Sequence, residues 1–165
     1  MEEKFTEVMV TGGAGFIGSN LVRELLPLAE KVVIVDNLST GRFVNIKDLL
    51  EEEKVELNLC DIAHKEELEK VFEKNNIEYI SHQAALASVP RSFKDPLASN
   101  KANVTGTLNV LQLAAEYKVK KVVFASSSSV YGDTPTLPKQ EDMKPEPLSP
   151  YAVTKLTGEH YAKVY

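Results

Sequence analysis

Three glycines, Gly12, Gly15 and Gly18, lie between a predicted strand and a predicted helix near the start of the chain. Residues 8–10 before them are apolar, as in a buried strand, and apolar residues recur at helical spacing over residues 16–26. A glycine permits backbone angles and close approaches that a Cβ would obstruct. The spacing therefore predicts a tight turn that leads from the first strand directly into the first helix.

A turn of this kind can bind a diphosphate. The first N–H groups of a helix have no carbonyl partner within it, so they can point at an anion. Gly18 would let the helix pack tightly on the preceding strand. An ordinary tight turn is the alternative, but the strand, the helix and a later acidic residue stand in the order of a dinucleotide site.

The later acidic residue is Asp36, which ends the β-branched run of residues 31–35. Such a run is typical of a parallel strand that is buried on both faces. The Asp36 carboxylate can accept hydrogen bonds from both hydroxyls of an adenosine ribose and would repel a 2′-phosphate, which favours NAD over NADP. An ordinary surface aspartate is the alternative. The polar loop that follows, with Asn37, Ser39 and Gly41, could continue around the adenosine.

Strands and helices alternate along the whole chain. We expect strands over residues 7–11, 31–35, 55–59, 78–81 and 121–125, and helices over residues 16–28, 45–53, 65–74, 96–117 and from 151 onward. This alternation predicts one α/β domain, residues 1–165, with a doubly wound parallel sheet in the strand order 3-2-1-4-5. Asn45 is a candidate cap for the second of these helices.

Size and charge limit what the chain can bind. Its 165 residues suffice for one domain and are too few for two ordinary ones. The formal net charge of −5 argues against nucleic acid or an anionic membrane surface as the main partner. Cys60 is the only cysteine, which suits a reducing compartment. Residues 1–4 lack the features of a signal peptide and no apolar run could span a membrane, so we expect a cytoplasmic domain.

Two further loops follow strands of the predicted sheet, where ligands bind in such folds. Asp61 and Ile62 are candidate adenine contacts, although Asp61 could equally cap the next helix. Residues 82–92 have mostly small side chains, which would let a cofactor approach the backbone. His82 is expected to be buried and bonded to the backbone rather than a catalytic base. None of the histidines stands at metal-ligand spacing, so no metal is expected.

Tyr151 and Lys155 are four residues apart in the last predicted helix, so they share a face. The Lys155 ammonium would favour the phenolate of Tyr151, whose ordinary pKa of about 10 otherwise keeps it protonated. Tyr151 could then act as a general base towards a sugar or alcohol hydroxyl. Ser127 or Ser128, at the end of the fifth strand, could share the hydrogen bond to the reacting oxygen. A solvent-facing pair is the alternative, but the order of the preceding motifs favours catalysis.

These motifs together resemble the extended short-chain dehydrogenase/reductase family, and within it the nucleotide-sugar 4-epimerases. The matching segments are residues 11–19, 36–41, 60–62, 82–92, 103–107, 126–133 and 149–155. The resemblance implies a Rossmann-like fold and a catalytic set of Ser127, with Ser128, Tyr151 and Lys155. It also implies that NAD is held by Lys155 at the nicotinamide ribose and by Phe16, Ile17, Ala84, Ala85, Ala87, Asn103 and Tyr151.

The resemblance further implies a UDP-sugar substrate. Dehydratases and decarboxylases of this family carry an acid just before Val-Tyr-Gly, where this chain has Ser128 and Ser129. In the implied mechanism Tyr151 takes the proton of the 4-hydroxyl while C4 gives a hydride to NAD, and the hydride returns to the other face of the 4-ketose. The sugar could be of the glucose, N-acetylglucosamine or glucuronate type. A dehydratase or reductase of the same fold, or a non-catalytic NAD-binding module, are the alternatives.

Members of this family continue into a substrate-binding lobe that residues 1–165 do not supply. We therefore expect the isolated chain to epimerise poorly or not at all, because catalysis requires the sugar to be held near the nicotinamide. The helix over residues 96–117 carries more apolar surface than one packing face needs. This surface, with the helix that bears Tyr151, predicts a homodimer.

Overall fold

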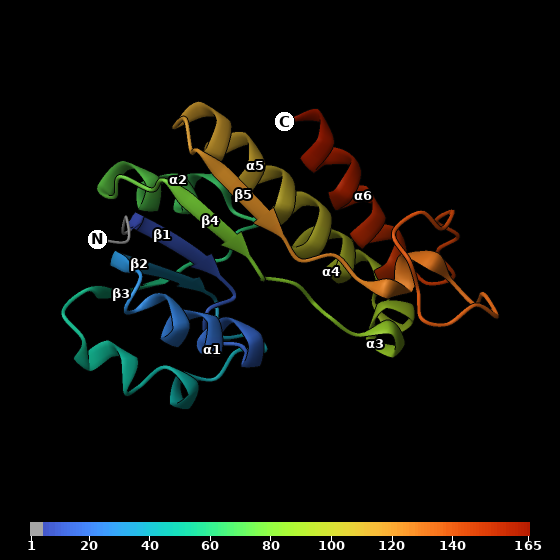
Figure 1. Ribbon diagram of the computed structural model, residues 1–165, viewed down its shortest axis with the longest axis horizontal. Helices are drawn as coiled ribbons and strands as arrows, with labels where there is room; N and C mark the ends of the chain where they lie inside the picture. The colour runs from blue at the N-terminus through green and yellow to red at the C-terminus, as the bar shows by residue number, and fades with distance from the viewer. Residues whose placement is uncertain (1–4) are drawn as a thin grey trace.

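The computed structural model describes residues 5–165 and contains one five-stranded parallel sheet in the order β3-β2-β1-β4-β5 (Figure 1). The strands are β1 (Phe5–Thr11), β2 (Ala29–Asp36), β3 (Val55–Leu59), β4 (Tyr79–His82) and β5 (Lys121–Phe124). The predicted fold class and strand order are confirmed. The expectation about a signal peptide concerned residues 1–4, which lie outside the described residues.

Helices cover both faces of the sheet, as Figure 1 shows. They are α1 (Phe16–Leu25), α2 (Lys65–Lys74), α3 (Val89–Lys94), α4 (Pro96–Asn100), α5 (Gly106–Glu116) and α6 (Pro150–Val164). Successive residues of a strand point to opposite faces. Met9 and Val33 therefore pack in the core formed with α2 and α5, whereas Val10 and Ile34 pack in the core formed with α1. Among the described residues, no helix is long and apolar enough to cross a membrane.

The prediction of a helix over residues 45–53 is wrong. Two short 3₁₀ turns, Phe43–Asn45 and Leu49–Glu51, stand in its place. Asn45 does not cap a helix, because its side-chain amide donates to the Ala14 carbonyl at 2.8 Å. The backbone N–H of Arg42 donates to the same carbonyl at 2.9 Å. The segment is therefore shaped by its attachment to the glycine turn rather than by helix propensity.

The long helix expected over residues 96–117 is present but interrupted. A π-helical segment, Lys101–Thr105, separates α4 from α5. Such segments change which side chains share a helix face. Here the π-helical segment carries the buried Asn103, whose side chain reaches both the loop after β4 and α6. The first helix ends at Leu25 instead of residue 28, because the chain turns over residues 25–28, which include Pro27.

Close backbone packing shapes the turn between β1 and α1. A Cβ on Gly18 would lie 2.2 Å from the Gly12 carbonyl oxygen and 2.8 Å from the Gly13 Cα. A Cβ on Gly15 would lie 3.2 Å from the same oxygen, which is tight but tolerable after a small shift. Gly12 itself has a φ of +69°, in the left-handed region that favours glycine. The turn can therefore exist in this form only with glycine at positions 12 and 18.

Replacing Gly18 with alanine should push α1 away from the turn and lower the free energy of unfolding by about 2–3 kcal/mol, as expected for overpacking. The matched variant Gly15→Ala should lose less than about 1 kcal/mol, because its new methyl group meets only one atom at a longer distance. Urea denaturation of the two variants and the parent measures both losses. Equal losses would contradict this account of the turn.

Candidate functional site

A cleft of about 340 Å³ opens at the carboxyl ends of the first four strands. The predicted cofactor residues that line it are Gly12, Gly15, Phe16, Ile17, Gly18, Asp36, Asn37, Ser39, Gly41, Asp61, Ile62, Ala84, Ala85 and Ala87. It is also lined by Val35, Thr40, Cys60, Gln83, Leu86 and Ala102, which were not predicted. All but Ala102 are sequence neighbours of predicted residues, whereas Ala102 reaches the cleft through the π-helical segment. The structure thus brings the predicted loops together in one place.

The glycine turn presents a helix N-terminus to this cleft. Gly15 is the N-cap of α1 and makes no side-chain cap bond, and the first turn contains no acidic residue. Its first N–H groups therefore lie beside the cleft without a carboxylate that would compete with an anion. The side chains of Phe16 and Ile17 are 83% and 65% exposed at the rim. This arrangement fits a bound phosphate or diphosphate.

Asp36 lies at the cleft with part of its hydrogen-bonding capacity in use. One carboxylate oxygen accepts from the Ala14 N–H at 2.9 Å and the other from the Leu38 N–H at 2.8 Å. A carboxylate offers about four acceptor positions, so two remain for a ligand. A Cβ on Gly41 would lie 2.8 Å from each oxygen, so a larger residue there would cover the carboxylate. The group thus fits a ligand with two neighbouring hydroxyls.

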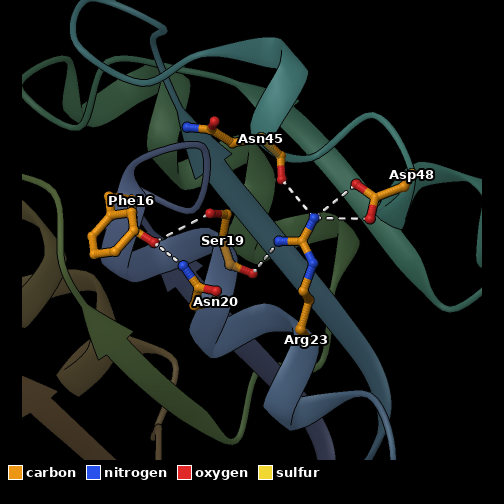
Figure 2. A network of polar contacts seen from close by, with 6 residues as sticks. All are labelled: Phe16, Ser19, Asn20, Arg23, Asn45 and Asp48. Atoms are coloured by element: carbon orange, nitrogen blue, oxygen red, sulfur yellow. Dashed lines mark hydrogen bonds and ion pairs between the residues drawn. The ribbon is translucent and has the colours of Figure 1, made fainter.

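A polar network fixes the loop after β2 on α1, as Figure 2 shows. The Arg23 guanidinium donates to the Ser19 and Asn45 carbonyls, each at 3.1 Å, and to the Asp48 carboxylate at 2.8 Å. The bond from Arg23 lowers the pKa of Asp48 below its ordinary value. Because Asn45 also holds Ala14, the loop and the glycine turn form one unit. Asp36 is therefore oriented before any ligand arrives.

Asp61 does not cap the following helix. Its carboxylate accepts from the Ala63 N–H at 2.9 Å within a local turn, and the N-cap of α2 is His64, which makes no side-chain cap bond. The Asn109 amide on α5 donates to the Ile62 carbonyl at 2.9 Å and holds this segment in place. Asp61 lines the cleft instead, and its contact with an adenine stays a prediction.

His82 is buried, as predicted, but its partners are not backbone groups. Its Nδ1 lies 2.6 Å from the Thr11 hydroxyl and its Nε2 lies 2.9 Å from the Thr107 hydroxyl. Burial, with a smaller effect of the Lys155 charge, lowers the pKa of His82 to about 3. The expectation of backbone partners is therefore wrong, because hydroxyls from β1 and α5 meet the ring. Within residues 5–165, no cluster of side chains suits a metal ion.

Asn103 does not line the cleft but supports it from behind. Its amide oxygen accepts from the Leu86 N–H at 2.7 Å, and its amide nitrogen donates to the Thr154 hydroxyl at 3.0 Å. Leu86 belongs to the cleft wall and Thr154 to α6. Asn103 therefore ties the loop after β4 to the helix that carries Tyr151 and Lys155.

Tyr151 and Lys155 are buried in α6 and lie outside the residues that line the cleft. The Ser149 hydroxyl accepts from the Ala152 N–H and caps the helix just before Tyr151. The Lys155 ammonium donates to the Ala125 carbonyl at 2.7 Å. Ala125 lies between the end of β5 and the serine run, residues 126–129. Burial lowers the pKa of Lys155 to about 8. An ammonium has three N–H donors, so two are left for other acceptors.

Within the serine run, the Ser127 hydroxyl is the one held ready to donate a hydrogen bond. Its Oγ accepts from the Ser129 N–H at 3.2 Å and from the Ser129 hydroxyl at 2.9 Å. With both acceptor positions in use, its own hydrogen can be donated to another oxygen. Ser128 is exposed, and the Ser126 hydroxyl donates to the Glu159 carboxylate. The end of β5 and α6 thus hold a hydroxyl donor and a phenol near a buried ammonium, a set suited to proton transfer at an alcohol.

A family model described as the NAD dependent epimerase/dehydratase family matches residues 8–165. The chain belongs to this family. A putative UDP-glucose 4-epimerase of Methanocaldococcus jannaschii is 42% identical over 159 residues, which cover 96% of this chain and 50% of the relative. The chain thus spans about half the length of the curated relatives it matches.

Solved structures of the family share the fold. UDP-glucose 4-epimerase of Thermus thermophilus in complex with NAD matches with a TM-score of 0.88 at 41% identity, over 96% of this chain and 50% of that one. The dTDP-glucose 4,6-dehydratase of Streptomyces venezuelae matches with a TM-score of 0.90 at 33% identity, over 96% of this chain and 51% of that one. Backbone likeness alone therefore does not separate epimerase from dehydratase.

The buried ammonium of Lys155 predicts a specific pH dependence of stability. Its pKa is lower in the folded chain than in the unfolded one, so below pH 8 the folded state holds an unfavourable buried charge. Between pH 8 and pH 10.5 the folded chain alone loses this proton, and the free energy of unfolding should rise by roughly 3 kcal/mol relative to Lys155→Met. Urea denaturation at several pH values measures the difference. For the control Lys163→Met, on the exposed end of α6, the free energy of unfolding should depend on pH as it does in the parent. If Lys155→Met also showed the pH dependence of the parent, the prediction would be refuted.

Proposed function

We propose that this chain binds NAD and carries the catalytic residues of a UDP-sugar 4-epimerase. The observation that carries the proposal is the cleft, which joins the glycine turn, Asp36 and the alanines after β4 in one wall. A diphosphate fits the N-terminus of α1, and an adenosine ribose fits the free acceptor positions of Asp36. The epimerase names of the relatives, and the NAD in the complex from Thermus thermophilus, support the same reading.

Within this proposal the two ends of the cleft have different tasks. Asn37, Ser39 and Gly41 surround the adenosine, with Asp61 and Ile62 beside the adenine. Ala84, Ala85 and Ala87 lie along the path from the diphosphate towards α6, where Lys155 binds the nicotinamide ribose. Asn103 acts on this path by holding Leu86, not by touching the cofactor. NAD, when bound, supplies the acceptor and donor of the hydride.

Tyr151, Lys155 and Ser127 carry out the proton transfer at the sugar 4-hydroxyl. Tyr151 removes the proton of the sugar 4-hydroxyl as general base, and the positive charge of Lys155 favours the phenolate that this requires. Ser127, with Ser128 beside it, donates a hydrogen bond to the same oxygen. The proton that Tyr151 accepts is returned when the 4-keto group is reduced from its other face.

Ser128 and Ser129 favour an epimerase over a dehydratase of the same fold. Dehydratases of the family carry an acid at one of these positions, and elimination of water needs such a group. Neither serine can serve as an acid near neutral pH, so the 4-ketose would be reduced again rather than dehydrated. Accumulation of a 4-keto product from UDP-sugars would favour the dehydratase reading instead.

We also propose that the protein is a cytoplasmic homodimer that pairs through α4, α5 and α6. Leu97 on α4 and Val153 on α6 are 81% and 50% exposed, and these two helices contact each other. Exposed apolar side chains on adjoining helices are the usual content of a subunit interface. Cys60, the only cysteine of the sequence, is a free thiol, which suits a reducing compartment.

Asp36 should decide which dinucleotide binds. Asp36→Asn keeps the size of the side chain but removes its charge and one acceptor, so the dissociation constant for NAD should rise about 10–100-fold. The repulsion of a 2′-phosphate should fall at the same time, and the preference for NAD over NADP should narrow. Titration calorimetry measures both ligands, with Glu53→Gln, an exposed position outside the cleft, as the charge-matched control. A parent chain that prefers NADP would contradict the assignment.

Tyr151 should be required for turnover. In a protein that includes the substrate-binding lobe, Tyr151→Phe should reduce UDP-sugar interconversion at least 100-fold, the usual contribution of a general base. NAD affinity should change by less than about threefold. Tyr161→Phe, on the same helix, is the matched control and should turn over like the parent. Residues 1–165 alone should show little interconversion with any of the UDP-sugars, and full activity there would refute the need for a further lobe.

A further inference from the structure

The ring of His82 lies where three elements meet beneath the cleft. It is 1% exposed and ends β4. Its two nitrogens face the hydroxyls of Thr11 at the end of β1 and Thr107 on α5, at 2.6 Å and 2.9 Å. The ring also stacks on Phe124 of β5 with centroids 5.7 Å apart. His82 does not line the cleft, and the proton chemistry proposed above does not use it.

The hydroxyl of Thr11 connects this ring to the cleft wall. Its oxygen accepts a hydrogen bond from the Ala84 N–H at 3.2 Å. The hydroxyl oxygen can accept twice and donate once, so Nδ1 of His82 either receives the hydroxyl hydrogen or donates its own hydrogen to the oxygen. In the neutral ring that receives the hydrogen, the proton lies on Nε2 and is donated to Thr107. This is the tautomer in which Thr11 links Ala84 to His82 through one accepted and one donated bond.

The backbone of Ala84 lies close against the glycine turn. A Cβ on Gly12 would lie 2.7 Å from the Ala84 nitrogen and 2.8 Å from its Cα. Gly12 and Ala84 both line the cleft, and Thr11 immediately precedes Gly12. The distance between these two walls is therefore set at the point where Thr11 holds Ala84. A shift of the Ala84 backbone would change the space left for a diphosphate.

We propose that His82 is a positioning residue for the diphosphate part of the site, which it shapes by orienting the Thr11 hydroxyl that holds Ala84 against Gly12. The proposal rests on the proposed binding of NAD. A histidine that only fills the core would affect stability alone, or would affect all ligands alike. A positioning role instead predicts a selective loss for ligands that carry the diphosphate.

The test compares Thr11→Val with Thr11→Ser in the 165-residue chain. Valine keeps the shape of threonine but cannot accept from Ala84 or donate to His82, whereas serine keeps the hydroxyl. Titration calorimetry with NAD and with adenosine, which lacks the phosphates, gives the affinities. For Thr11→Val we expect at least a tenfold weaker affinity for NAD and less than a twofold change for adenosine. Thr11→Ser should stay within twofold of the parent for both ligands.

The outcomes separate this proposal from the proposed function. A parent chain that does not bind NAD refutes the function, whereas a parent that binds NAD with Thr11→Val equally tight refutes the positioning role. Equal losses for NAD and adenosine also refute it.

If circular dichroism shows that Thr11→Val is unfolded, nitrogen NMR of the unaltered chain decides. We expect His82 to carry its proton on Nε2, and its Nδ1 resonance to shift when NAD is added. The opposite tautomer, or no response to NAD, would overturn the proposal.

Discussion

The site depends on how closely three pieces of backbone approach one another at the ends of β1 and β4. The Gly12 carbonyl lies against Gly18 on α1, and the Gly12 Cα lies against the Ala84 backbone. These contacts aim the first N–H groups of α1 into the cleft and define its floor. Ala14, in the same turn, donates to Asp36 and accepts from the loop after β2. One tight turn thus orients both the anion-binding groups and the carboxylate.

Much of this could be predicted because it follows from local patterns. Short apolar runs, some alternating and some continuous, located all five strands, and the glycines and Asp36 lie at strand ends, as their spacing predicted. The errors arise where distant segments override local preference. The residues around Asn45 form turns because Ala14 accepts their bonds, and Lys101–Thr105 is π-helical where Asn103 bridges Leu86 and Thr154. In each case the bonded residues are far apart in the sequence, so the spacing of apolar residues cannot predict these bonds.

The partners of His82 illustrate the same limit. Its burial follows from its place at the end of a central strand, but the identity of its partners depends on Thr107, which is 25 residues away. The expectation from the sequence considered only backbone carbonyls and amides as partners. The ring finds hydroxyls because α5 packs across the end of β4 and β1 ends in a threonine. Side-chain chemistry at the meeting point of three elements is a tertiary property.

The proposed adenosine end and the proposed reacting end of the site are supported in different ways. Asp36 is held by backbone bonds, and the Arg23 network that Figure 2 shows fixes the following loop on α1, so this end lies within one compact unit. Tyr151 and Lys155 lie beyond the cleft wall, and Asn103 joins their helix to it by bonding both Leu86 and Thr154. The bond from Lys155 to Ala125 holds the same helix to the end of β5. Burial without a carboxylate partner lowers the pKa of Lys155 to about 8, so its charge is sensitive to anything that approaches it. This end thus contributes a buried cation whose pKa is lowered by burial, whereas the other end contributes an oriented carboxylate and the backbone N–H groups of a helix N-terminus.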